Sequence, residues 1–284
     1  MADKQLAIKQ FISMFSLRDR NIIVTGASGL LGREHVNAIL GAGGTPILLD
    51  LNQEVLDMQV LELKRSFAQH ISGYAVDITN EEQVKENVKK IILKYGKIDG
   101  LVNNAANNPK VENSSEINFS RLENFPINIW NKDLDVALTG TFLCTKYYGF
   151  EISKNPKGGS IVNISSDLGL IAPDQRLYRI KGLKESLQPV KPITYSVVKT
   201  GIIGLTRYVS TYWAEKNVRC NAICPGGVEN NQNQEFVDEL IKRIPMKRMA
   251  KQDEYQGILV FLLSNASSYI NGSIISADGG RTAW

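Results

Sequence analysis

Short apolar runs alternate with longer amphipathic stretches along this chain. The runs are rich in valine and isoleucine, which is typical of strands buried on both faces of a parallel sheet. Seven of them are predicted to be strands: Asn21–Val24, Pro46–Leu49, Tyr74–Val76, Gly100–Val102, Ser160–Ile164, Val218–Cys224 and Ser273–Ala277. The pattern predicts an α/β fold, with one doubly wound, Rossmann-type domain around a parallel seven-stranded sheet.

One predicted helix carries recognisable end signals. It covers Glu81–Tyr95, where Thr79 and Glu82 have capping-box spacing and Gly96 follows the last turn. We therefore expect Thr79 to cap its first turn and Gly96 to end it.

Three segments lie outside a minimal version of this plan. Residues 1–16 form an N-terminal extension, whose apolar spacing (Leu6, Phe11) fits either a short docking helix or a frayed tail. Residues 17–284 form the domain itself. It contains insertions near 107–127 and 172–193, which are polar and contain prolines. Long ordered loops are often functional, so we expect these insertions to border the site.

Composition narrows the class of protein. With 43% hydrophobic residues the chain can build a full core. Its 33 basic and 29 acidic side chains are spread along the chain, which argues against binding to nucleic acid or to a membrane surface. Three cysteines without zinc-ligand spacing indicate reduced thiols, and no metal site is expected. No run resembles a signal peptide or a membrane span, so we expect a cytoplasmic protein.

A glycine-rich turn follows the first predicted strand and opens a helical stretch. Its glycines allow the backbone to approach a pyrophosphate, while the helix N-terminus offers unpaired N–H groups. The spacing alone also fits a turn that binds nothing. The cofactor-binding residues predicted here are Gly26, Ser28, Gly29, Leu30, Leu31 and Gly32.

Asp50 ends the second predicted strand, about 20 residues past the glycines. There a carboxylate can accept hydrogen bonds from an adenosine ribose and would repel a 2′-phosphate, so NAD is favoured over NADP. Arg33 could still pair with a phosphate, which leaves NADP open. Asp50 could instead be a simple strand-end or helix-capping aspartate.

Tyr195 and Lys199 are four residues apart in a helical stretch, which places a phenol and an ammonium on one face. We expect the ammonium to lower the pKa of Tyr195, so that its hydroxyl can take or give a proton near neutral pH. Ser166 follows the fifth strand, where it could hydrogen-bond the reacting oxygen. Each residue alone has a structural explanation, but their combination predicts a catalytic site.

Taken together, these motifs resemble the short-chain dehydrogenase/reductase family from about Leu17 to the C-terminus. The resemblance implies that Asp77 holds the adenine amino group, that Asn103 braces the sheet, and that Lys199 also binds the nicotinamide ribose. It also implies homodimers or homotetramers. Further cofactor-binding residues implied by it are Ile78, Asn104, Ala105, Tyr195, Pro225, Gly226 and Val228.

The chain also departs from the family pattern. Ala137 stands where the family usually has an asparagine that holds a proton-relay water, so the relay is rebuilt or absent. The loop before Tyr195 is long and basic, which points to an anionic, sugar-type substrate, with Arg176 and Arg179 as candidate ligands, or else to a solvated surface loop. Parts of the chain are similar to a bacterial group associated with flagellin glycosylation and nonulosonic-acid synthesis.

We therefore predict an NAD(P)-dependent oxidoreductase that interconverts a secondary alcohol and a ketone on a polar, anionic sugar-type small molecule. One alternative is a sugar-modifying epimerase or dehydratase that retains its NAD. Another is a non-catalytic, NAD-binding regulatory subunit, which the alanine at position 137 favours and the intact Ser166, Tyr195 and Lys199 disfavour.

Overall fold

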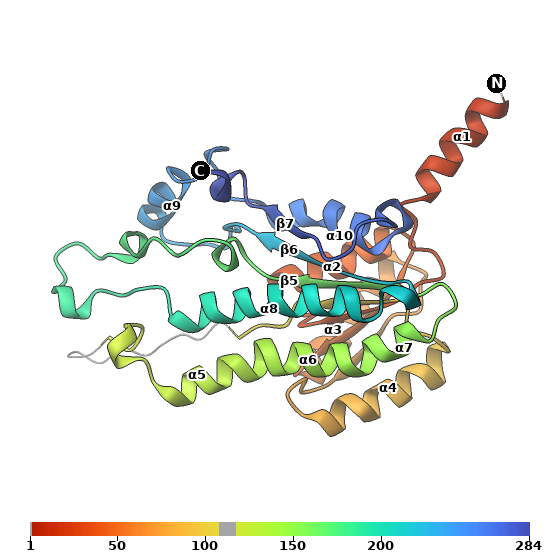
Figure 1. Ribbon diagram of the computed structural model, residues 1–284, viewed down its shortest axis with the longest axis horizontal. Helices are drawn as coiled ribbons and strands as arrows, with labels where there is room; N and C mark the ends of the chain where they lie inside the picture. Colours follow the sequence, from red (N-terminus) through yellow and green to blue (C-terminus); the bar gives the residue numbers. More distant parts are fainter. Residues whose placement is uncertain (1, 108–117) are drawn as a thin grey trace.

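The computed structural model describes residues 2–107 and 118–284 (Figure 1). Residues 108–117, within the first predicted insertion, lie outside the described part. The sheet has seven parallel strands in the order β3-β2-β1-β4-β5-β6-β7, which confirms the predicted doubly wound fold. The strands are β1 (Asn21–Thr25), β2 (Thr45–Asp50), β3 (Ser72–Ala75), β4 (Gly100–Asn103), β5 (Gly159–Ile164), β6 (Val218–Pro225) and β7 (Ile274–Ala277).

Helices cover both faces of this sheet, as Figure 1 shows. One face is covered by α2 (Leu30–Gly41), α3 (Gln53–Ser66) and α10 (Gln256–Leu263). The other is covered by α4 (Glu81–Tyr95), α8 (Ile193–Tyr212) and a long helix between residues 127 and 153. Within the described residues, no helix combines the length and the apolar character needed to cross a bilayer.

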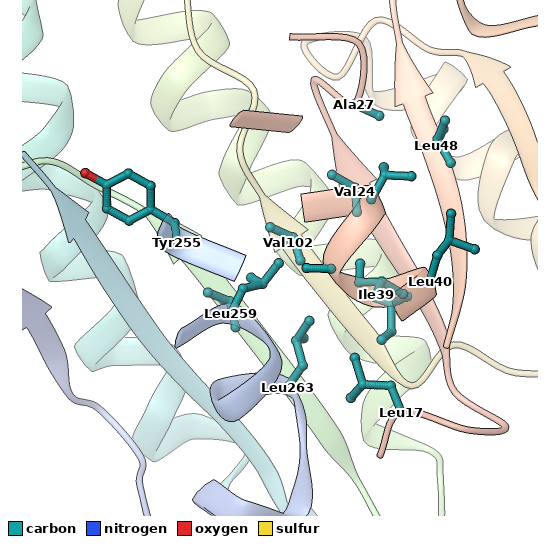
Figure 2. Packing of buried hydrophobic residues seen from close by; sticks show 14 of the residues in the cluster. Leu17, Val24, Ala27, Ile39, Leu40, Leu48, Val102, Tyr255, Leu259 and Leu263 are labelled. Carbon is teal, nitrogen blue, oxygen red and sulfur yellow. The ribbon is translucent and has the colours of Figure 1, made fainter. Parts of the chain in front are cut away.

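Alternation along the strands divides the core into two clusters. Val24 of β1 and Val102 of β4 point to the first face, where they meet Ile39 of α2 and Leu259 of α10 (Figure 2). Ile23 points the opposite way and joins the second cluster. Because successive strand side chains alternate between faces, each buried strand needs apolar residues at every position, which explains the runs in the sequence.

The long helix contains two wider π-helical turns. It consists of α5 (Ile127–Leu134), a π turn over Asp135–Gly140, α6 (Thr141–Cys144), a second π turn over Thr145–Gly149, and α7 (Phe150–Ser153). Gly140 lies where the helix packs against the loop after β3, since a Cβ there would come within 2.6 Å of Ile78 Cδ1. Such turns often lie at functional sites, and the first one contains Ala137.

The ends of α4 differ in part from the prediction. Its N-cap is Asn80, whose side chain accepts a hydrogen bond from the Gln83 N–H, so the predicted Thr79 capping box is wrong. Thr79 instead donates its hydroxyl to Asp77 Oδ1 at 2.7 Å. The predicted stop at Gly96 is confirmed, because its φ of +75° lies in the left-handed region that favours glycine.

The N-terminal extension is helical but does not dock. Helix α1 (Ala2–Ser13) stands away from the body of the molecule in Figure 1. Leu6, Phe11 and Ile12 on it remain 56%, 62% and 63% exposed, so these side chains do not dock on the domain of the same chain. The chain meets the domain just after α1, where the Phe15 ring centroid lies 6.4 Å from that of Phe261.

All three cysteines are buried inside the domain. Cys144 lies on the long helix, and Cys220 and Cys224 lie on β6. Each side chain belongs to a residue with no exposed surface, and burial raises the pKa of all three thiols. They are therefore packed thiols, as the sequence indicates.

Candidate active site

A cavity of about 750 Å³ opens at the carboxyl edge of the sheet. It lies where β1 pairs with β2 on one side and with β4 on the other, which is the point where the winding of the sheet reverses. Ligands of doubly wound sheets bind at such switch points. The predicted cofactor residues that line the cavity are Gly26, Ser28, Gly29, Leu30, Leu31, Asp50, Asp77, Ile78, Asn104, Ala105, Tyr195, Lys199, Pro225, Gly226 and Val228.

The glycine-rich turn leaves backbone open to a ligand. Gly26 has a φ of +62°, and a Cβ there would lie 2.9 Å from Ala105 Cα. Gly32 does not line the cavity, but a Cβ on it would meet Gly26 O at 2.0 Å, so it fixes the tight turn. The N-cap of α2, Gly29, makes no side-chain capping bond. The N–H groups of this helix end are therefore available to an anion, and the turn fits a dinucleotide pyrophosphate.

Asp50 faces the cavity from the end of β2. Its Oδ2 accepts a hydrogen bond from the Ser28 N–H at 2.9 Å, and its Oδ1 accepts one from the Leu51 N–H at 2.8 Å. It does not cap α3, because Asn52 does so by accepting a bond from the Val55 N–H. The helix-capping alternative for Asp50 is thus wrong, and its carboxylate is held beside the glycine turn.

Two asparagines at the carboxyl end of β4 hold the cradle together. Asn103 is buried, and its amide donates to Asn163 Oδ1 at 2.8 Å and to Thr145 Oγ1 at 3.1 Å. These bonds tie β4 to β5 and to the long helix, which agrees with the bracing role that the resemblance implies. Asn104 donates to the Thr25 and Gly26 carbonyl oxygens at 3.0 and 3.1 Å. It therefore positions the glycine turn directly.

The predicted catalytic residues come together at the other end of the cavity. The Tyr195 hydroxyl donates to Ser166 Oγ at 3.4 Å, across from the end of β5. Lys199 Nζ lies 5.9 Å from the Tyr195 ring centroid and donates to the Ile164 carbonyl oxygen at 2.9 Å. Ser166 also caps a 3₁₀ turn by accepting a bond from the Leu168 N–H. Helix α8 thus positions Tyr195 and Lys199, and the end of β5 positions Ser166.

The expected lowering of the Tyr195 pKa is not found. Burial is the largest influence and raises the pKa of Tyr195, while the Ser166 hydrogen bond lowers it in part. Burial also lowers the pKa of Lys199, to about 8. The sequence shows that the ammonium and the phenol are close, but it does not show that folding removes water from both. Loss of water disfavours the phenolate of Tyr195 and the ammonium of Lys199.

Burial of the Lys199 ammonium predicts a stability effect. Its folded-state pKa of about 8 lies below the usual 10.5. The loss of folding stability caused by burying the charge is therefore fully present below pH 8 and disappears as the pH rises from 8 to 10.5. We expect Lys199→Met to raise the free energy of unfolding by about 1–3 kcal/mol at pH 7 and by less at pH 10. Denaturant titrations at both pH values, with the exposed Lys216→Met as control, measure it. A less stable Lys199→Met protein at pH 7 would contradict the expectation.

The structure does not bring Arg176 and Arg179 into the cavity. Arg176 pairs with Asp174 at 2.8 Å and its side chain is 78% exposed, while Arg179 pairs with Glu185 at 2.7 Å. Neither arginine lines the cavity, and each is paired with a carboxylate of the same loop, so nothing in this geometry supports them as substrate ligands.

The inserted loop nevertheless forms one wall of the cavity. Asp174 also pairs with Arg243 at 2.6 Å, and Leu177 packs with Leu240 of α9 (Gln234–Ile241). In Figure 1 the loop and α9 lie at the same end of the molecule. The second insertion therefore borders the site, as expected, through Leu177, Tyr178 and Lys191.

Two cations that sequence reasoning did not select line the cavity instead, Lys191 and Arg281. Lys191 belongs to the same basic loop, and its spacing of four residues before Tyr195 mirrors that of Lys199 after it. That spacing is the signal that could have singled it out. Arg281 follows β7 and forms an ion pair with Asp167, 114 residues away, which no local pattern reveals.

Ala137 borders a small side cavity of about 50 Å³, together with Asp133 and Lys199. Asp133 is buried and accepts hydrogen bonds from Thr194 Oγ1 at 2.5 Å and from Asn107 Nδ2 at 2.8 Å. A carboxylate one turn earlier on the helix thus supplies a polar group near the place where alanine replaces the family's asparagine.

A dinucleotide cradle, followed along the same cavity by a tyrosine, a lysine and a serine, defines the class of nicotinamide-dependent oxidoreductases. Comparison with known proteins gives the family. A family model described as enoyl-(acyl carrier protein) reductase matches residues 26–282. The chain belongs to the short-chain dehydrogenase/reductase family and is an NAD(P)-dependent oxidoreductase.

Curated relatives align over almost their full length. A 3-oxoacyl-[acyl-carrier-protein] reductase of Thermotoga maritima is 30% identical, covering 93% of this chain and 98% of that protein. A post-translational flagellin modification protein A of Campylobacter coli is also 30% identical, with the same coverage. An NAD-dependent glycerol dehydrogenase of Listeria innocua is 28% identical, covering 98% of this chain and 99% of that protein.

Solved structures share the fold. A short-chain dehydrogenase from Leptospira borgpetersenii with bound NAD⁺ superposes with a TM-score of 0.79 at 29% sequence identity. The match covers 94% of either chain. The cradle described above therefore lies in a fold that holds a nicotinamide dinucleotide in a similar protein.

Proposed function

We propose that the protein is an NAD-dependent dehydrogenase that interconverts a secondary alcohol and a ketone on a small, polar, sugar-type substrate. The observation that carries this proposal is the convergence of Tyr195, Ser166 and Lys199 in one cavity with the glycine cradle. The names of relatives such as the glycerol dehydrogenase support a polyhydroxylated substrate.

The chain's own residues supply the acid/base chemistry. The bound dinucleotide would accept or give the hydride, held by the glycine turn, Asp50 and Asp77. During oxidation Tyr195 takes the alcohol proton as its phenolate, a form that the positive charge of an oxidised nicotinamide would favour, and during reduction the phenol returns the proton. The Ser166 hydroxyl, which donates to Asp167 Oδ1 in the structure, would turn its proton to the reacting oxygen, and Lys199 would bind the ribose beside Tyr195. The position of Tyr195 Oη near Ser166 Oγ supports one common binding point for the substrate oxygen.

The test is a screen for NADH formation with polyols, sugar acids and sugar phosphates. Turnover of at least one of them, at a rate that depends on Tyr195, is the expected result. No NADH with any of them, together with intact NAD binding, would favour the regulatory alternative. Formation of an epimer or a dehydrated product without net NADH would favour the epimerase or dehydratase alternative.

The choice of NAD over NADP rests on Asp50. Its carboxylate lies beside the glycine turn, where it would accept hydrogen bonds from an adenosine ribose and would repel a 2′-phosphate. Arg33, the possible phosphate partner, donates its Nε–H to the Ser28 carbonyl oxygen at 3.1 Å. We expect Asp50→Ser to lower the ratio of kcat/KM with NAD to kcat/KM with NADP by about 10- to 100-fold.

Asn52→Ser is a matched control for Asp50→Ser, because serine keeps the α3 cap and the change leaves the cradle intact. Steady-state kinetics with both cofactors measure the ratio. A wild-type protein that already prefers NADP would contradict the assignment of Asp50.

The proposal includes a cytoplasmic location and association into homodimers or homotetramers. The buried thiols support a reducing compartment. Exposed aromatic side chains on two neighbouring helices support association: Phe142 and Phe150 on the long helix, and Tyr208 and Tyr212 on α8. Light scattering of the purified protein measures the number of subunits, and a monomer would contradict this part.

A further inference from the structure

Lys191 occupies an unusual position beside the proposed catalytic tyrosine. It lies just before α8, half-buried, with its Nζ only 3.8 Å from the Tyr195 ring centroid. Its side chain borders both the main cavity and the small side cavity. Among residues 2–107 and 118–284, no carboxylate forms an ion pair with it. Burial lowers the pKa of this ammonium, because removing water from it disfavours its charged form.

A second cation reaches the same cavity from the far end of the chain. Arg281 Nη1 forms an ion pair with Asp167 Oδ2 at 2.6 Å, and the two side chains are only 8% and 5% exposed. Asp167 Oδ1 in turn accepts the Ser166 hydroxyl at 2.8 Å. The guanidinium is therefore held in place next to the serine, and it still lines the cavity.

The charges of this group do not balance. Around this end of the cavity Lys191, Arg281 and Lys199 carry three positive charges, while Asp167 and the Asp133 carboxylate of the side cavity carry two negative charges. One positive charge is thus left over in a partly dry space, where a single bound anion would offset it. A monoanion completes the balance, whereas a dianion such as a phosphate monoester would leave an excess of negative charge.

We propose that Lys191 and Arg281 form a carboxylate-binding subsite beside Tyr195, so that the substrate is a small hydroxy acid of the sugar-acid type. This inference rests on the proposed dehydrogenase function and deepens it. The carboxylate contacts Lys191 Nζ and the Arg281 guanidinium, and a hydroxyl further along the substrate reaches Tyr195 and Ser166. Bound in this way, the substrate presents one carbon to the hydride-carrying end of the cofactor.

Matched ligands that differ only at one end test the subsite. D-Gluconate and sorbitol share a six-carbon polyol chain, but only gluconate carries a carboxylate; glycerate and glycerol form a shorter pair. Sorbitol 6-phosphate carries a dianion instead. Calorimetric titration of each into the NADH-saturated protein measures binding without turnover of the alcohols.

The expected result is that at least one acid binds about 10- to 100-fold more tightly than its neutral partner. Lys191→Met removes most of this ratio, and Lys191→Arg restores a large part because it keeps the charge. Lys184→Met changes an exposed lysine of the same loop that does not line the cavity, and it leaves the ratio unchanged.

Three outcomes would overturn the subsite: equal binding of acids and neutral partners, a ratio that Lys191→Met does not alter, or tighter binding of the phosphate than of the acids. Equal effects of Lys191→Met on both partners would instead assign Lys191 to packing on the Tyr195 ring. The proposed function is tested separately by NADH formation. Turnover of neutral polyols alone would contradict the carboxylate subsite but support the dehydrogenase function. Lys191-dependent binding of acids without any turnover would support the subsite but contradict the dehydrogenase function.

Discussion

Replacing Tyr195 with phenylalanine lowers kcat by about 10²- to 10⁴-fold, the usual contribution of a positioned acid or base. The ring remains, so its contact with Lys191 and the packing of α8 persist. Only the hydroxyl that hydrogen-bonds Ser166 Oγ is lost. The variant should therefore fold normally and retain NADH binding, which separates a loss of proton transfer from a loss of structure.

Initial rates of NADH formation and a fluorescence titration with NADH measure the two effects. Tyr269→Phe provides the control, since it makes the same chemical change at a fully exposed side chain that does not line the cavity. Turnover by Tyr195→Phe at the wild-type rate would remove the tyrosine from the mechanism and, with it, the central argument for the site.

Gly32→Ala is expected to abolish measurable dinucleotide binding and to lower the free energy of unfolding by about 3 kcal/mol. The added methyl group would lie 2.0 Å from Gly26 O and 2.9 Å from Ala27 Cα. Both atoms belong to the backbone, so relief requires the glycine turn itself to move. A displaced turn no longer presents the N–H groups of α2 to a pyrophosphate.

The same helix offers a matched control. Gly41 ends α2, and a Cβ built on it meets nothing within 4 Å. Gly41→Ala should leave NADH binding unchanged and stabilise the protein slightly, by at most about 1 kcal/mol. Chemical denaturation and NADH titration of both variants provide the measurements. Wild-type affinity in Gly32→Ala would mean that the close backbone approach at this turn is not needed.

The fold and the residues at both ends of the cavity can be predicted from the sequence because they depend on local rules. Continuous apolar runs predict strands buried on both faces, and parallel strands bring their carboxyl ends to one edge. The convergence of Asp50, Ser166 and the glycine turn can therefore be predicted without knowing how the side chains pack. The pair Tyr195 and Lys199 is equally local, since four residues make one helical turn.

The remaining differences concern groups whose state depends on side-chain pairing and burial in the folded chain. Basic composition drew attention to Arg176 and Arg179, but Asp174 and Glu185 neutralise them. The pKa of Tyr195 depends on how much water the folded chain removes, which a helical spacing does not reveal.

The sequence also does not show what covers the N-terminal extension. Its apolar spacing indicates a face that a partner could cover, and it does not say whether this domain supplies the cover. In the structure, helix α1 leaves Leu6, Phe11 and Ile12 exposed.

The buried thiols give this enzyme an internal reporter of unfolding. Cys144, Cys220 and Cys224 are shielded from reagents, and their raised pKa values keep them protonated, so the native state should resist alkylation. Cys144 lies behind the second face of the sheet, while Cys224 lies near the end of β6. Labelling rates at the separate cysteines would therefore reveal whether the cofactor end of the domain opens before the rest or together with it.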